Sequence, residues 1–157
     1  RKEGEALMEF RMEAALPHPP QRVWPVMVDI ARIASCIPGC EQVEERKRLA
    51  DYTAVMKQKI GPFKLEVPAQ ITVEEHQEPN LVRARASGRD KFTRTTLDVA
   101  LKVTLMPVDG GMCQLAVEAD LQVAGRLATL GHSVIKKRAE ENFAEFERRF
   151  LAELEAI

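Results

Sequence analysis

The chain has 157 residues, of which 45% are hydrophobic and 30% are charged, and its formal net charge is −1. That length suits a single domain with its own hydrophobic core, which we assign to residues 1–157. The near-neutral charge gives no basic excess that would indicate nucleic acid as a partner. The 3 cysteines cannot all pair in disulfides, so we expect a reducing, cytoplasmic setting. No apolar run approaches the roughly 18 residues that a membrane-spanning helix needs.

The N-terminal part of the chain predicts one strand followed by two short helices. In "LMEFRMEAAL" every second residue is apolar, which is typical of a strand with one buried face. The next stretch, "PPQRVWPVMVDIARIASC", opens with two prolines that suit the first turn of a helix. Ile30, Ile33 and Ile37 follow at helical spacing and predict a second short helix after Asp29.

The stretch "CIPGC" ends these helices, and its cysteines, Cys36 and Cys40, raise the question of metal or redox chemistry. A structural zinc site usually needs two close pairs of ligands, and Cys113 with 3 scattered histidines supplies no second pair. A redox dithiol normally has two intervening residues rather than three. A Pro-Gly pair is typical of a type II turn. We therefore predict a turn flanked by small apolar cysteines, with no metal and no cofactor.

Alternating runs also dominate the middle of the chain. The clearest are "LDVALKVTL" and "CQLAVEADLQV", which flank a Gly-rich turn and predict an antiparallel hairpin with one solvent-facing side. "KLEVPAQITVEE" alternates in the same way, although Pro68 within it indicates an edge strand or a bulge. With "YTAVMKQKI", "LVRARASG" and a short strand after Cys40, the pattern predicts an antiparallel meander of about seven strands.

The last segment, 127–154, is the strongest helix prediction. Its apolar residues step by three or four and form one stripe, while charged residues cover the remaining surface. The stripe consists of Ile135, Ala139, Phe143, Phe146, Phe150 and Leu154. A sheet with one apolar face must bury that face, and this helix is the only predicted element long enough to cover it. We therefore expect an apolar ligand to bind where the sheet and the helix diverge, near the start of the helix.

The order of these elements resembles the helix-grip fold of the lipid-transfer, pollen-allergen and polyketide-cyclase superfamily (SRPBCC, START-like). Three stretches resemble one branch of it, the carbon-monoxide dehydrogenase G-subunit family: "VWPVMVDIARIASCIPGC", "KIGPFKLEVPAQITV" and "VAGRLATLGHSVIKKRAEENFAEF". The resemblance covers nearly the whole chain. It implies an α+β fold in which a curved antiparallel sheet wraps around a long C-terminal helix.

The resemblance also implies a function. Members of the family serve molybdenum hydroxylases as accessory proteins, with recruitment of the enzyme to the membrane and binding of quinone or a similar lipid as their proposed roles. We therefore expect a hydrophobic ligand, a molybdenum hydroxylase partner, and a location in the cytoplasm or at the inner face of the membrane. The expected ligand-binding residues are Ile33, Ile37, Val67, Ile71, Leu97, Val99, Leu130, Val134, Ile135 and Phe143.

Two other functions stay open at this point. A cyclase-like or hydrolase-like enzyme would need a titratable group in the cavity, and the strands place mostly aliphatic residues there, so we expect no catalysis. His132 near the helix start has no nucleophile beside it in the sequence. A pure adaptor would have a filled core and would dock through the basic cluster in "VRARASGRDKFTR", for which a solvated outer face is the simpler interpretation.

Overall fold

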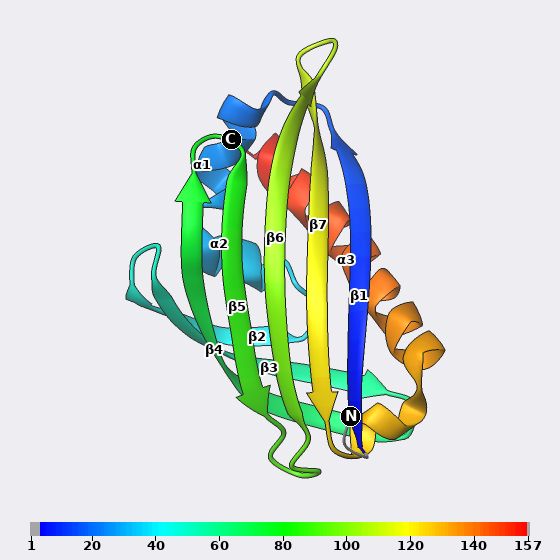
Figure 1. Ribbon diagram of the computed structural model, residues 1–157. Coiled ribbons are helices and arrows are strands. Elements are labelled where there is room, and N and C mark those ends of the chain that lie inside the picture. Colours follow the sequence, from blue (N-terminus) through cyan, green and yellow to red (C-terminus); the bar gives the residue numbers. More distant parts are fainter. Residues whose placement is uncertain (1–3, 157) are drawn as a thin grey trace.

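The computed structural model, which describes residues 4–156, is built around one antiparallel sheet of seven strands (Figure 1). The strands are β1 (Glu5–Leu16), β2 (Cys40–Lys47), β3 (Asp51–Ile60), β4 (Phe63–Gln77), β5 (Leu81–Arg89), β6 (Thr96–Val108) and β7 (Met112–Ala124). Their order across the sheet is β1-β7-β6-β5-β4-β3-β2. The predicted meander is confirmed for β2 to β7, and β1 pairs with β7 to form the opposite edge.

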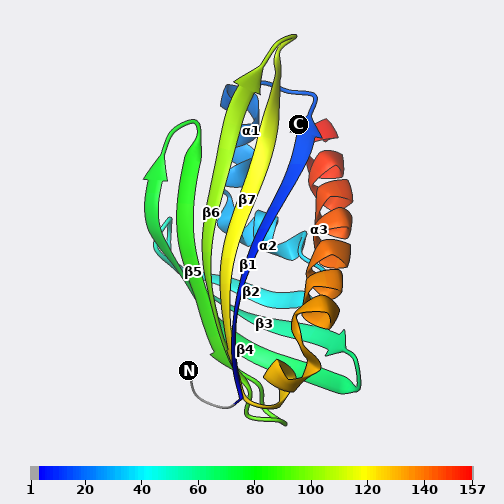
Figure 2. The same ribbon diagram turned by 45° about the vertical axis from the view of Figure 1, so that its right-hand side comes forward.

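The helices are α1 (Pro20–Met27), α2 (Ile30–Ser35), the short 3-10 helix η1 (Arg126–Leu130) and α3 (His132–Glu155). The two short helices connect β1 to β2, and Pro20 stands at the first helical position of α1, as the paired prolines predict. Figure 2 shows the strands as one curved layer with α3 lying along one of its faces. This arrangement is the α+β helix-grip fold that the element order predicts.

The long C-terminal helix begins later than its apolar spacing indicates. The spacing predicts a helix from residue 127, whereas Gly131 has a φ of +88° and separates η1 from α3. That backbone conformation is accessible to glycine and costly for residues with a β-carbon. Because of this break, η1 and α3 are separate helices. Leu127 within η1 is almost completely buried.

The proline in β4 is another difference from the prediction. Pro68 does not mark an edge strand, because β4 lies between β3 and β5. It does not mark a bulge either, because the pairing with β3 runs through Pro68 without a register shift. The pairing with β5 begins only at Ala69, which leaves the missing N–H of Pro68 outside that ladder.

Buried side chains form two clusters, one near each end of α3. In the first, which we call the C-terminal cluster, Phe150 and Leu154 are grouped with buried residues of α1 and of the sheet. In the second, the N-terminal cluster, Ile135 and Leu127 are grouped with buried residues of β1, β4 and β7. No buried residue belongs to both clusters. The buried core therefore consists of two separate clusters.

Candidate ligand-binding cavity

An apolar cavity of about 320 Å³ lies between the sheet, α2 and the C-terminal half of α3. Phe146 and Phe150 of α3 form one wall, and Ile30 and Ile33 of α2 form another. Strands β3 to β7 supply the remaining wall with Ala, Val, Ile, Leu and Met side chains. Within the described residues, only Cys40 brings a titratable group to this lining. Such an apolar site suits the hydrophobic part of a small molecule.

The cavity exists because small side chains occupy the inner face of three neighbouring strands. Ala54 of β3 pairs with Ala69 of β4, and Ala86 of β5 pairs with Ile71 of β4. These alanines and Ala84 line the cavity. Larger aliphatic residues at the same positions would fill the space to normal core density. Sequence reasoning missed the alanines, although their inward positions in alternating runs were a readable signal.

Four of the residues expected to bind the ligand lie on the cavity wall. They come from α2, from the turn that follows it and from the middle of the sheet: Ile33, Ile37, Ile71 and Val99. Their side chains share one apolar surface with Phe146 and Phe150, which the helix stripe placed in the core. Whether these residues contact a ligand stays a prediction.

The other six expected residues lie away from the cavity lining. Val67 and Ile135 are buried in the N-terminal cluster, and Leu97 and Leu130 pack against it. Phe143 packs against the C-terminal cluster, and Val134 is 38% exposed. At the start of α3, Leu127 of η1 is buried in the same N-terminal cluster. The apolar cavity lies toward α2 and not at the start of α3.

The "CIPGC" stretch forms the predicted turn at the edge of this cavity. The N–H of Cys40 donates to the carbonyl of Ile37 at 3.0 Å, and Gly39 has a φ of +83°, as the third residue of a type II turn requires. Cys36 is buried and Cys40 lines the cavity. Burial raises the pKa of both thiols, which keeps them protonated and unreactive at neutral pH.

A polar cluster borders the cavity where β3, α3 and this turn meet. The side-chain carbonyl Oε1 of Gln58 accepts hydrogen bonds from Arg138 Nε and Asn142 Nδ2, each at 3.1 Å. Gln58 Nε2 donates to the carbonyl of Pro38 at 2.6 Å and lies 3.3 Å from the sulfur of Met56. Met56 lines the cavity, so the polar cluster and the apolar wall are in direct contact.

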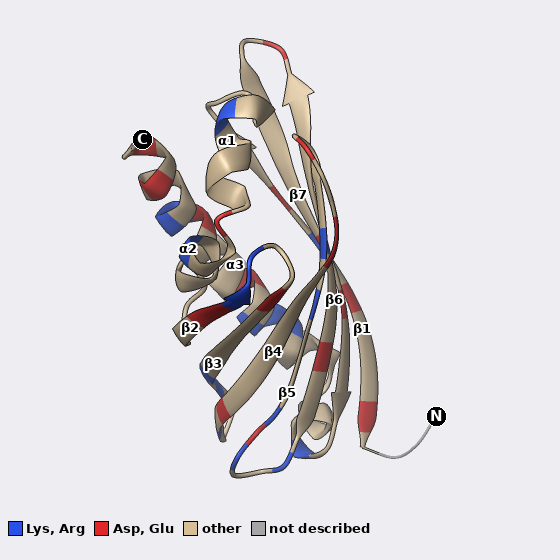
Figure 3. Cartoon of the chain, turned by 90° about the vertical axis from the view of Figure 1, so that its left-hand side faces the viewer, with Lys and Arg blue, Asp and Glu red and all other residues tan. Residues whose placement is uncertain are grey.

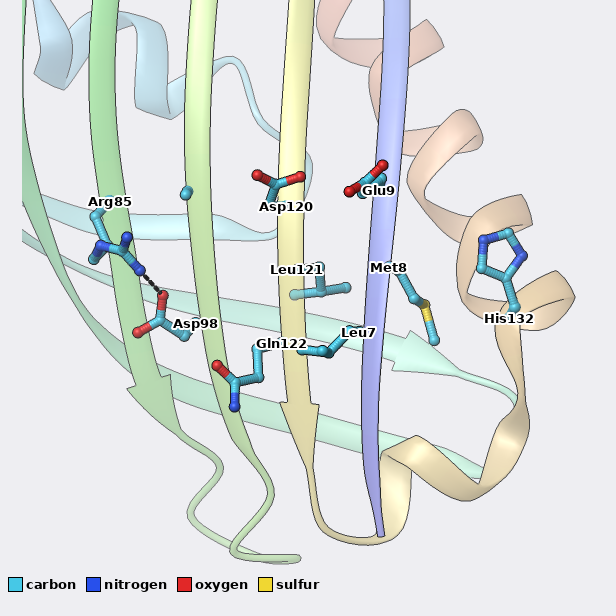
Figure 4. Close-up of a pocket in the computed structure, with 10 residues that line it drawn as sticks. Leu7, Met8, Glu9, Arg85, Asp98, Asp120, Leu121, Gln122 and His132 are labelled. Carbon is cyan, nitrogen blue, oxygen red and sulfur yellow. Dashed lines mark hydrogen bonds and ion pairs between the residues drawn. The ribbon is translucent and has the colours of Figure 1, made fainter. Parts of the chain in front are cut away.

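A second hollow, of about 600 Å³, lies on the opposite face of the sheet and is open to solvent (Figure 4). It carries Arg85, Asp98, Asp120 and His132. Arg85 donates to Asp98 at 2.5 Å, and His132 lies beyond β1, stacked against Phe10 with ring centroids 5.9 Å apart. No serine, threonine or cysteine lines this hollow within the described residues. His132 thus packs against Phe10, and no described residue that lines the hollow beside it is a serine, threonine or cysteine nucleophile.

The basic cluster of β5 belongs to the solvated outer face. Arg83 forms an ion pair with Glu75 at 3.0 Å, and Arg85 contacts both Asp98 and Glu74. Figure 3 shows Lys and Arg segments interspersed with Asp and Glu segments over the strands and helices. Charges that are balanced locally form a weak basis for a docking patch. The structure thus favours the solvated-face interpretation over docking.

Residues 4–156 contain no group of three or more His, Cys, Asp and Glu residues arranged to hold a metal ion. In the same part of the chain, no helix has both the length and the apolar character needed to cross a bilayer.

Comparison with known proteins places the chain in a family. The family model for CoxG, the G subunit of carbon monoxide dehydrogenase, matches residues 13–154. The chain belongs to this family. The match includes the turn at Gly39, the alanines of the sheet and all of α3 except its last residue, so every residue that lines the cavity lies within the matched range. No curated protein matches the chain.

Solved structures share the helix-grip fold of this CoxG family member at low sequence identity. A conserved protein from Geobacillus kaustophilus has a TM-score of 0.85 at 19% identity, with 95% of this chain and 96% of that chain covered. The ZhuI aromatase/cyclase from Streptomyces sp. R1128 has a TM-score of 0.66 at 12% identity, with 96% and 94% covered. Ara h 8.0201 has a TM-score of 0.58 at 17% identity, with 94% and 99% covered. These likenesses support the fold and not a particular ligand.

Proposed function

We propose that this protein binds a hydrophobic small molecule of the quinone or lipid type in the cavity between the sheet and α3. The observation that carries the proposal is the composition of the cavity wall, which is aliphatic, aromatic or sulfur-containing throughout. Each methylene group that leaves water for such a site contributes roughly 0.8 kcal/mol. A short hydrocarbon chain is therefore enough to give measurable affinity.

The same wall supports binding rather than catalysis. General acid-base chemistry needs a positioned titratable group, and nucleophilic chemistry needs an activated one. Cys40 is the titratable residue on the wall, and burial raises the pKa of its thiol. A ligand held there meets no group poised to attack it or to move a proton. We therefore propose that the protein is a carrier or accessory protein and not an enzyme.

The proposed partner is a molybdenum hydroxylase of the carbon-monoxide dehydrogenase type, and this part rests on the family alone. Surface-immobilised protein and a purified aerobic carbon-monoxide dehydrogenase would be tested for saturable binding. Saturable binding is expected. Absence of binding, with lipid uptake intact, would contradict the proposed partner but not the ligand-binding proposal.

The ligand-binding proposal is tested by filling the cavity. Ala84→Phe places a large side chain on the cavity wall, and Ala100→Phe is a matched control, because Ala100 lies on the neighbouring strand and lines the outer hollow. Each purified protein would be incubated with bacterial lipid extract and examined by native mass spectrometry. We expect bound lipid in the wild type and in Ala100→Phe, and a strong loss in Ala84→Phe. Equal uptake by all three proteins would contradict binding in this cavity.

A further inference from the structure

We infer that Gln58, Asn142 and Arg138 form a polar subsite for the oxygen-bearing head of an amphiphilic ligand whose hydrocarbon chain lies in the cavity. We call these three residues the polar rim. The inference rests on the proposed function, because it assumes that the cavity is occupied by an apolar chain.

The inner face of β3 and the cavity-facing side of α3 both change from apolar to polar residues next to the cavity. Along β3 the residues on the inner face are Ala54 and Met56, which line the cavity, followed by Gln58. Along α3, Phe150 and Phe146 line the cavity, and Asn142 and Arg138 continue the same face at intervals of four residues. The two stripes converge, since Gln58 accepts hydrogen bonds from both Asn142 and Arg138 at 3.1 Å.

The polar rim adjoins the cavity wall directly, through Met56. Gln58 Nε2 lies 3.3 Å from the sulfur of Met56 and 2.6 Å from the carbonyl of Pro38, the residue after the cavity-lining Ile37. Gln58 and Asn142 are half-buried, and Arg138 is 36% exposed. Residues at this depth lie between the dry wall and the solvent. A ligand head at this position would keep part of its hydration.

Two residues of the polar rim, Arg138 and Asn142, have polar atoms that form no hydrogen bond within the described part of the protein. Within residues 4–156, Arg138 Nη2 donates to no protein group, and Asn142 Oδ1 accepts from none. Arg138 Nη1 is only loosely paired with Glu141, at 3.6 Å. The interior offers no comparable donor, so a ligand oxygen placed there would lose its hydrogen bonds to water without replacement. The guanidinium therefore selects a head with acceptor oxygens, such as a carboxylate or a ketone, and disfavours an ammonium head.

The test compares three ligands of similar chain length, dodecanoate, methyl undecyl ketone and dodecylammonium, by isothermal titration calorimetry. In the wild type we expect dodecanoate and the ketone to bind about tenfold or more tightly than dodecylammonium, because one charge-assisted hydrogen bond is worth about that factor. In Arg138→Met this preference should fall by about tenfold, because the guanidinium is the donor that a carboxylate or ketone oxygen would meet. Lys137→Met is the matched control, since it removes the same charge from the adjacent exposed position.

The outcomes separate this inference from the proposed function. Equal binding of all three ligands by the wild type, or an unchanged preference in Arg138→Met, would overturn the polar rim and leave the cavity proposal intact. Failure of every ligand to bind the wild type would overturn the cavity proposal itself. The alternative is that the rim residues only stabilise the contact between β3 and α3. In that case Arg138→Met would lower the midpoint of thermal unfolding and weaken all three ligands by the same factor, which would also overturn the inference.

Discussion

Gly39 and Lys57 are joined backbone to backbone, and the N–H of Lys57 donates to the carbonyl of Gly39 at 2.8 Å. A β-carbon at position 39 would collide with the carbonyl oxygen of Lys57. The turn after α2 thus packs so closely against β3 that only glycine, which has no β-carbon, fits at position 39. This contact holds Ile37 and Cys40 at the cavity wall.

Replacement of Gly39 by alanine should therefore destabilise the fold for two reasons. The φ of +83° strains any residue with a β-carbon, and the collision with Lys57 adds to that strain. Gly110→Ala is the matched control, because Gly110 has a φ of +87° with nothing within 4 Å of an added β-carbon. We expect a loss of about 1–2 kcal/mol for the control and of about 3 kcal/mol or more for Gly39→Ala, measured by urea unfolding. Similar losses for both would show that the close approach to Lys57 is unimportant.

The buried carboxylate of Asp90 should make stability depend on acid pH. Asp90 is 1% exposed, and burial alone would raise its pKa, but hydrogen bonds from Thr93, Glu66 and Phe92 outweigh burial and lower the pKa. Because the folded-state pKa lies below the unfolded value, the contribution of Asp90 is fully present above about pH 4 and is lost as the pH falls further.

Asp90→Asn should therefore lower the free energy of unfolding by about 2 kcal/mol at pH 7, since an amide nitrogen would face backbone N–H donors. The difference from the wild type should shrink at pH 3. Urea unfolding at both pH values measures it, with Asp109→Asn in the exposed β6–β7 turn as the control. A difference that stays constant between pH 7 and pH 3 would contradict the assignment.

The double variant Cys36→Ala, Cys40→Ala should retain both fold and ligand uptake. Neither thiol is ionised at neutral pH, and each acts as a small apolar side chain. We expect some loss of stability from the smaller side chain at the buried Cys36, and a dissociation constant for methyl undecyl ketone within about threefold of the wild type. Calorimetric titration and circular dichroism test both expectations. Loss of binding with an intact fold would show a direct role for the thiols.

Affinity should rise with the length of the ligand chain. Because the wall is apolar, each added methylene should improve the dissociation constant by about fourfold until the cavity is full. Octanoate, decanoate and dodecanoate form the series, and Ala84→Phe should reach its limit at a shorter chain than Ala100→Phe. Affinities that do not change with chain length would indicate that the chain lies outside the cavity.

Much of the fold could be predicted from local patterns. Alternation in β1, β6 and β7 identified which side chains face inward, because successive residues of a strand point to opposite faces. The Pro38-Gly39 pair identified its turn because each residue suits one position of a type II turn. Proline is restricted to the φ of the second position, and glycine permits the positive φ of the third. The stretches that resemble the CoxG family predicted the helix-grip fold as a whole.

The position of the cavity was decided by the tertiary structure. Ala54, Ala69, Ala84 and Ala86 lie on three strands, and only the register of the sheet brings their small side chains together. The break at Gly131 likewise separates η1 from α3, and Leu127 of η1 is buried in the core. The sequence by itself determined that an apolar sheet face and an apolar helix stripe must meet. The place of the cavity between the sheet and the helix depends on contacts between residues that are far apart in the chain. Those contacts form only in the folded protein.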